Sequence, residues 1–384
     1  MLYNLIRNVQ YFIMNIFSAN EDINLNDFEW ALSYMTVDQD SINVIKKFRN
    51  YIKGPIFGCS SSNGVFTPYG FKRGAYFLAA KKEDNIHVYP VMNMAMGKTA
   101  YNIAKMSATE IKENFGIPDI ILLHSTPGFE ERVIEGIIEI FGQNMPVYGG
   151  SAADDNFNGK WFIFKDSLKL KEGFLMVGIK ANDIYNNFIS GYLPTRHSGI
   201  LTKVNSRIAY EIDNRPAAIV YNEWTGGLID KYIGKGGTIL NITSLYPIGR
   251  NFGEDDGHKI YLLSHPHMVL PENNGITFFT ELKEGERIWL MHENKEALVD
   301  KVKLVAQNVQ EVTGKEILKG AILIYCAGII KTISNQANIV AEKYRYVINN
   351  APFIGAATAG EQGFFKGNIN KSSHGNLMIN TIIF

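Results

Sequence analysis

The residues with the clearest capacity for chemistry lie in three short loops, each of which follows a glycine-marked strand. The first loop carries a thiol, hydroxyls and an amide, and the other two add carboxylates. Hydroxyls and free backbone N–H groups can hold a carboxylate, whereas Asp and Glu can hold an ammonium group. This combination suits a zwitterion such as an amino acid, although the same residue types also satisfy their own backbone in ordinary turns. The loop residues of this candidate site are Cys59, Ser60, Ser61, Asn63, Gly150, Ser151, Asp154, Asp155, Thr358, Gly360 and Glu361.

The thiol of the first loop could act as a nucleophile. Cys59 would then need a lowered pKa and a base, and His124, at the end of an expected strand, could supply that base. A Cys- or Ser-dependent hydrolase is therefore one alternative function. The arrangement is generic, and a small packing cysteine is the simpler interpretation; Cys326 ends an apolar strand and is expected in the core. We expect no catalytic residue.

Histidines offer two further chemistries. His265 and His267 lie near His258, but zinc needs three or four converging ligands, and the intervening proline indicates a bend, so we expect no bound metal. Haem needs an axial histidine in an apolar slot, and His374 is the residue to test first. No identifying haem spacing occurs, and we expect no cofactor. The glycines at 234–237 do not form a dinucleotide fingerprint.

A repeated segment must position the three loops. Proline, two β-forming residues, glycine and three small residues recur at 55–61, 146–152 and 352–358. Proline suits the start of a strand, and glycine followed by small residues permits a tight turn. Helical periodicity precedes each copy, and an apolar strand follows it. The repeating unit is therefore strand, helix, short strand, loop, strand, and we expect the three loops to meet around a shared hollow.

The pattern also predicts the bounds of individual elements. We expect first strands at 11–17, 119–124 and 321–325, and a hairpin at 200–212. The three repeat helices are expected to be capped by Ser41, Thr126 and Ser334, and the last strand to open at His374. A degenerate fourth copy is expected around 247–262, and a long helix at 294–312.

Length and composition limit the class of protein. The 384 residues are 46% hydrophobic, with 38 Lys and Arg residues against 38 Asp and Glu residues, which excludes a general nucleic-acid binder. Polar residues interrupt the apolar start of the chain, so no membrane span is expected. Two cysteines are too few for a disulfide framework, which fits a reducing compartment. We expect a cytoplasmic protein without nucleic-acid or membrane partners.

The repeats indicate an α/β fold with helices covering the sheets. Two related mixed-sheet domains, built from the repeated β-α-β-loop-β unit, are expected at residues 1–196 and 197–384. A polar linker is expected at 193–199.

Several segments, in this order, resemble a known family. They are 56–61, 149–155, 213–220, 278–285, 326–328, 352–355, 359–361 and 374–376. Residues 10–384 resemble the FIST proteins, whose modules are the FIST N and FIST C domains. The resemblance implies a small-ligand sensor for amino acids or similar metabolites, associated with a histidine kinase, a cyclase or a chemotaxis protein. Some members resemble haem-bearing nitric-oxide sensors, which makes a haem-dependent sensor the other alternative.

The chain departs from the family pattern where arginine is common. Ile329 and Ile330 follow the Cys-x-Gly segment, and residues 261–264 contain no arginine. A guanidinium would hold a carboxylate in bidentate fashion, and Arg250 could supply it instead. Together with His374 and Asn376, Arg250 completes the candidate ligand site. We expect a non-catalytic sensor that binds a small ligand and passes its signal to a separate protein.

Overall fold

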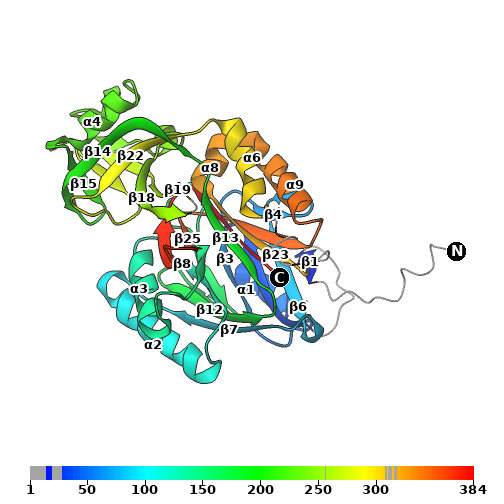
Figure 1. Cartoon of the computed structure of the whole chain (residues 1–384). Helices are drawn as coiled ribbons and strands as arrows, with labels where there is room; N and C mark the ends of the chain where they lie inside the picture. The colour runs from blue at the N-terminus through cyan, green and yellow to red at the C-terminus, as the bar shows by residue number, and fades with distance from the viewer. Residues whose placement is uncertain (1–13, 20–27, 256, 308, 310–313, 315–317) are drawn as a thin grey trace.

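The computed structural model describes residues 14–19, 28–255, 257–307, 309, 314 and 318–384. Four sheets organise this part of the chain. Three of them combine parallel and antiparallel pairs, and the fourth is built from antiparallel pairs. Figure 1 shows helices packed on the outside of these sheets. The predicted mixed α/β fold is therefore confirmed.

Three units share one sheet topology. In each, a central strand lies between a parallel short strand and an antiparallel strand that comes later in the chain. The central strands are β2 (Phe28–Met35), β8 (Ile120–Ser125) and β23 (Ala321–Cys326). The short strands are β3 (Ile56–Ser60), β9 (Val147–Gly150) and β24 (Phe353–Thr358). The later strands are β6 (Ala75–Lys81), β12 (Phe174–Ala181) and β27 (Met378–Ile383). The repeated unit read from the sequence is thus present three times.

An outer strand and helices complete each unit. The outer strands are β1 (Asn15–Ser18), β7 (Ile86–Asn93) and β13 (Tyr185–Ser190). The helices between central and short strands are α1 (Ser41–Phe48), α3 (Glu130–Phe141), and the pair α8 (Ala327–Ile333) and α9 (Ala337–Val347). In the second and third units, α2 (Ala100–Asn114) and α6 (Lys295–Val305) also lead into the central strand.

A hairpin links each unit to another. The hairpins that follow the three loops are β4 (Val65–Thr67) with β5 (Gly70–Lys72), β10 (Ile163–Lys165) with β11 (Leu168–Leu170), and β25 (Glu361–Phe365) with β26 (Lys371–Gly375). The first hairpin pairs with β24, the second with β3 and the third with β9. Each unit therefore extends a different unit's sheet, and the three exchanges form a closed cycle.

The motif glycines permit the parallel pairing. A Cβ atom on Gly58 would lie 1.8 Å from the carbonyl oxygen of Ser33, its partner on β2. A Cβ atom on Gly149 would lie 1.9 Å from the carbonyl oxygen of Leu123. Both glycines also have positive φ, at 156° and 147°. Only glycine fits there, which explains why this residue marks the repeat.

A further sheet is inserted between β13 and α6, and we call residues 193–292 the insertion. Its strands are β14 (Leu193–Asn205), β15 (Ile208–Ile212), β16 (Arg215–Pro216), β17 (Gly237–Thr238), β18 (Ile248–Asp255), β19 (His258–Ser264), β20 (Pro266–Val269), β21 (Ile276–Phe278) and β22 (Arg287–His292). Two short helices, α4 (Ala217–Trp224) and α5 (Leu240–Thr243), accompany them. Leu201, Tyr221 and Val269 belong to a hydrophobic core of its own.

The insertion confirms one prediction and corrects two. The expected hairpin at 200–212 is present as β14 and β15. The expected fourth copy is wrong, because it would need a parallel strand pair. In the described structure β18 pairs with β19 and with β22, and both pairs are antiparallel. The expected linker at 193–199 instead forms the start of β14, where Leu193, Pro194, Ser198 and Gly199 pair with β22 across a register shift.

Other expected bounds also shift. The first central strand is β2 rather than 11–17, of which residues 11–13 lie outside the described part and 15–17 belong to β1. Asp40, not Ser41, caps α1, since its carboxylate accepts the Asn43 N–H. Of the helix expected at 294–312, α6 accounts for Lys295–Val305, and residues 308 and 310–313 are not described.

Two more caps and one strand end differ from expectation. The hydroxyl of Thr126 bonds to the backbone of Gly173, and α3 starts only at Glu130. Ser334 has a φ of 41° and begins the short 3-10 turn that separates α8 from α9. His374 lies within β26 rather than opening the last strand.

Candidate ligand pocket

The three loops do meet at the centre of the molecule. Backbone N–H groups at equivalent positions each donate to the carbonyl of another loop. These hydrogen bonds join Ser62 to Ala357 at 3.0 Å, Ala153 to Ser60 at 3.2 Å, and Ala359 to Ser151 at 2.9 Å. The cycle of bonds matches the cycle of exchanged hairpins and holds the loops in direct contact.

Most polar groups of the first two loops are engaged in holding the loops together. The hydroxyl of Ser60 accepts the Phe162 N–H, and that of Ser61 accepts the Ala357 N–H. The Asn63 N–H donates to Asp155 at 2.7 Å. Asp154 accepts backbone N–H groups of its own turn, those of residues 156, 158 and 160. These side chains therefore stabilise the loop junction instead of facing an open hollow.

The thiol of Cys59 is buried in this junction and is not prepared for catalysis. Burial raises its pKa, which opposes formation of the nucleophilic thiolate. The expected base, His124, hydrogen-bonds to the Tyr34 hydroxyl and the Gly150 carbonyl at 3.0 and 2.9 Å. Burial lowers the pKa of His124 to about 4. The geometry does not favour a Cys-dependent hydrolase.

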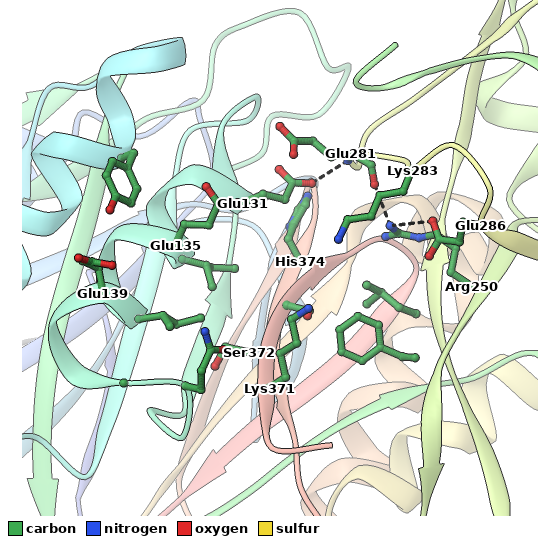
Figure 2. A pocket seen from close by; sticks show the side chains of 18 residues that line it. Glu131, Glu135, Glu139, Arg250, Glu281, Lys283, Glu286, Lys371, Ser372 and His374 are labelled. Carbon is green, nitrogen blue, oxygen red and sulfur yellow. Dashed lines mark hydrogen bonds and ion pairs between the residues drawn. The ribbon is translucent and has the colours of Figure 1, made fainter. Parts of the chain in front are cut away.

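A cavity of about 620 Å³ opens beside the junction, between α3, β26 and the insertion (Figure 2). We call it the α3 pocket. Its lining residues are Tyr101, Glu131, Ile134, Glu135, Ile138, Glu139, Gly142, Gln143, Arg250, Phe252, Leu262, Glu281, Lys283, Glu286, Lys371, Ser372, Ser373 and His374. Of the predicted site residues, Arg250 and His374 line it.

One side of the α3 pocket is acidic. Glu131, Glu135 and Glu139 are spaced four residues apart, so they follow one face of α3, as Figure 2 shows. Glu135 pairs with Arg132 at 2.9 Å and Glu139 with Lys105 at 3.2 Å. All four of these paired side chains are 43–50% exposed, so the pairs are weak and can be exchanged.

The opposite side of the α3 pocket carries the three cationic side chains of the lining, Arg250, Lys283 and Lys371, together with Glu281 and Glu286 (Figure 2). Arg250 donates to the Glu281 carbonyl at 2.7 Å and lies 3.9 Å from Glu286, but its buried Nε has no hydrogen-bond partner among the described residues. Burial lowers the pKa of Lys371, and the charges of Lys283 and Arg250 lower it further. These cations repel one another, and the carboxylates of Glu286 and Glu135 offset part of that repulsion.

His374 forms the buried floor between these two sides. Its Nδ1 lies 3.2 Å from the amide nitrogen of Gln362. Its Nε2 is 3.8 Å from a carboxylate oxygen of Glu130, too far for a hydrogen bond, and has no partner within the described chain. A buried polar atom without a hydrogen-bond partner is costly, and His374 is one of the residues that line the cavity.

An ion-pair cluster ties the insertion to the N-terminus of α3. Arg207 donates to Glu130 at 2.8 Å and to Glu131 at 2.5 Å. The Glu281 N–H donates to Glu131 at 2.8 Å, and the Ser151 hydroxyl to Glu130 at 2.7 Å. Burial alone would raise the pKa of Glu130, but His374 and Arg207 lower it well below its ordinary value. Glu130 is therefore ionised and holds Arg207 in place.

The remaining predicted residues are Thr358, Gly360 and Glu361 of the third loop and Asn376, which follows β26. Glu361 accepts the Thr358 hydroxyl at 2.8 Å and the Met378 N–H at 3.1 Å. Burial raises its pKa to about 8, so this carboxyl is neutral at pH 7. The side-chain nitrogen of Asn376 is buried without a hydrogen-bond partner in the described structure. A Cβ atom on Gly360 would lie 3.2 Å from that nitrogen and 2.3 Å from the His374 ring, so Gly360 makes room for both.

Two cofactor hypotheses can be compared with this geometry. Glu130, Glu131 and His374 bring potential metal ligands within 4.8 Å of one another, but Arg207 is already paired with both carboxylates and its charge opposes a divalent cation. Haem needs an apolar slot beside its axial histidine, whereas His374 faces Glu130 and a pocket with charged walls. The residues do not fit haem.

The sequence analysis missed most of the α3 pocket. Glu131, Glu135 and Glu139 gave a readable signal, since their spacing places three carboxylates on one helical face. Lys283 and Lys371 gave none, because nothing in the sequence indicates that the two segments converge.

No helix in the described part of the chain has the length and apolar character needed to span a membrane.

Comparison with known proteins agrees with the earlier resemblance. The models of the FIST N domain and the FIST C domain match residues 31–215 and 217–364. An uncharacterized protein of Methanocaldococcus jannaschii, MJ1623, is 28% identical over 208 residues, which cover 48% of this chain and 39% of that relative. The chain thus aligns with less than half of the relative's length. FIST domains are in general sensory domains that bind small ligands. Since the two models cover most of the sequence, this chain belongs to the FIST family.

Proposed function

We propose that this FIST protein senses an amino acid or a similar zwitterionic metabolite, which binds in the α3 pocket. The observation that carries the proposal is that three glutamates line the α3 side of the pocket, whereas its three Lys and Arg side chains lie on the facing side. The glutamates of α3 can hold an ammonium group, and Arg250, Lys283 and Lys371 can hold a carboxylate. Each end of a zwitterion would meet its complement.

Two buried nitrogen atoms support a polar ligand in this place. Arg250 Nε and His374 Nε2 lack hydrogen-bond partners within the described chain, and both residues line the same pocket. Their side chains are 9% and 1% exposed. A ligand carboxylate near them would relieve the cost of leaving buried groups unpaired.

The position of the α3 pocket suggests how binding is reported. The pocket lies where the insertion meets α3, and Arg207 and Glu281 hold these two parts together. A ligand that contacts both parts would change how tightly the insertion is held. We propose that a partner such as a histidine kinase, a cyclase or a chemotaxis protein responds to this change in how the insertion is held. The role is non-catalytic, and the free cysteines Cys59 and Cys326 fit the reducing cytoplasm.

Calorimetric titration and thermal unfolding test the proposal. Amino acids should raise the melting temperature, since a ligand at 100 times its Kd stabilises the fold by about 2.7 kcal/mol. Simple amines and simple carboxylates should bind at least about tenfold more weakly than the zwitterion, because each fills one wall only.

A matched pair of variants locates the binding site. Lys283→Gln should weaken binding about tenfold, since it removes one cation from the basic wall. Lys46→Gln, an exposed change on α1, should leave binding unchanged. The proposal is wrong if no zwitterion shifts the melting temperature at millimolar concentration, or if Lys283→Gln binds as tightly as the parent protein.

A further inference from the structure

The length of the acidic wall points to a narrower ligand class. We infer, resting on the proposed function, that the ligand is a basic amino acid, in which a second cationic group stands several methylene groups away from the zwitterionic end. Its α-carboxylate would lie near Arg250 and His374. Its α-ammonium would lie near Glu131, and its distal cation near Glu135 and Glu139.

The acidic wall is longer than one ammonium group needs. A helix rises 1.5 Å per residue, so the backbone positions of Glu131 and Glu139 are about 12 Å apart along α3. A single α-ammonium group contacts one or two carboxylates. The outer carboxylates lie on the same face of α3 and line the same pocket, so they can receive a second cation.

Apolar residues lie between the charges. Ile134 and Ile138 alternate with the glutamates on the pocket face of α3, and Leu262 and Phe252 line the pocket from the insertion. Such side chains favour methylene groups, because contact removes apolar surface from water. A ligand with a charged zwitterionic end, an aliphatic middle and a cationic tip matches this order.

The charge of the lining also favours a cation. Five glutamates line the α3 pocket, against three Lys or Arg side chains. The partners of Glu135 and Glu139, Arg132 and Lys105, are half-exposed and lie outside the lining. A ligand cation bound inside the pocket, where water is partly excluded, can therefore compete with them.

The test compares ligands that differ only at the tip. The full chain is titrated with L-lysine and with L-norleucine. The two side chains have the same four carbons, and only that of L-lysine ends in an ammonium group. L-lysine should bind at least about tenfold more tightly. 1,5-Diaminopentane, which lacks the carboxylate, should bind more weakly than L-lysine, and L-glutamate should also bind more weakly.

Variants then test whether Glu139 binds the distal cation of the ligand. Glu139→Gln should reduce the preference for L-lysine about fivefold and leave L-norleucine binding unchanged. Glu113→Gln, an exposed change on α2 outside the pocket, should change neither. Glu139 is half-exposed, so its substitution should not disturb folding.

The outcomes separate this inference from the proposed function. Equal binding of L-lysine and L-norleucine, tighter binding of L-glutamate, or an unchanged preference in Glu139→Gln would overturn the inference and leave an amino-acid sensor standing. Failure of every amino acid to bind would overturn both.

Discussion

Two buried carboxyl groups near the centre of the molecule differ in charge state because their neighbours differ. Glu130 lies beside Arg207 and His374, which lower its pKa and keep it ionised. Glu361 has no cationic partner among its described neighbours, which are the Thr358 hydroxyl, the Met378 N–H, the Cys326 thiol and the Glu130 carboxylate, and burial raises its pKa to about 8. One group therefore anchors the insertion, whereas the other is a neutral part of the core at pH 7.

The neutral state of Glu361 predicts a pH dependence of stability. Between its ordinary pKa and about pH 8, the folded chain keeps a proton that the unfolded chain releases. The contribution to stability is therefore fully present below about pH 4.5 and is lost as pH rises through about 8. The associated slope is at most about 1.4 kcal/mol per pH unit.

Glu361→Gln tests this dependence, because an amide cannot ionise. In urea unfolding between pH 5 and pH 9, the variant should lose less stability than the parent protein as pH rises. Glu113→Gln, at an exposed site, serves as the control and should keep the parent slope. Identical pH profiles for Glu361→Gln and the parent would show that Glu361 is already ionised in the folded protein.

At the scale of elements, the molecule depends on close contact between each short strand and its central strand. Gly149 faces the Leu123 carbonyl on β8 with no room for a side chain. Gly159 also has a positive φ, at 82°, but a Cβ atom there would meet nothing within 4 Å. Substituting each of these two glycines by alanine therefore separates the free-energy cost of the steric contact from that of backbone strain.

Gly149→Ala should therefore destabilise the fold far more than Gly159→Ala. The strain of a positive φ alone costs about 1–2 kcal/mol, which is the loss expected for Gly159→Ala. Gly149→Ala adds displacement of β8 from β9, and we expect a loss above about 4 kcal/mol or failure to fold. Chemical denaturation of the two variants makes the comparison, and equal losses would contradict the close-contact explanation.

At the scale of the whole molecule, the two halves of the chain share their sheets. β4, from the first half, pairs with β24, and β25, from the second half, pairs with β9. β13 likewise pairs with β27. We therefore expect the three repeated units to unfold as one cooperative structure, although the family models divide the sequence into two domains.

Fragments 1–196 and 197–384 should not fold separately, because each would lack strands that the other supplies. When co-expressed, they should form a complex with a single thermal transition. Circular dichroism and gel filtration of each fragment, alone and mixed, make the measurement. Cooperative melting of an isolated fragment would contradict the shared-sheet explanation.

The repeat and its loops could be predicted from the sequence because their causes are local. Gly58 and Gly149 satisfy a contact that only glycine permits, and the β-forming residues before them form short buried strands. Residue type alone gave wrong helix caps. Thr126 has the right residue type for a cap, but its hydroxyl bonds to Gly173 on a distant segment, and that contact cannot be read locally.

The sequence by itself determined the α/β class, the three repeated units, the convergence of their loops and the family. Only the tertiary structure decided where a ligand could bind. Glu131, Lys283 and Lys371 lie on segments far apart in the chain, and they line one cavity because the exchanged hairpin carries β26 to the side of α3. Hydrogen bonds close the space between the loops, whereas charged side chains from three distant segments line the pocket beside them, where burying an unpaired charge would be costly.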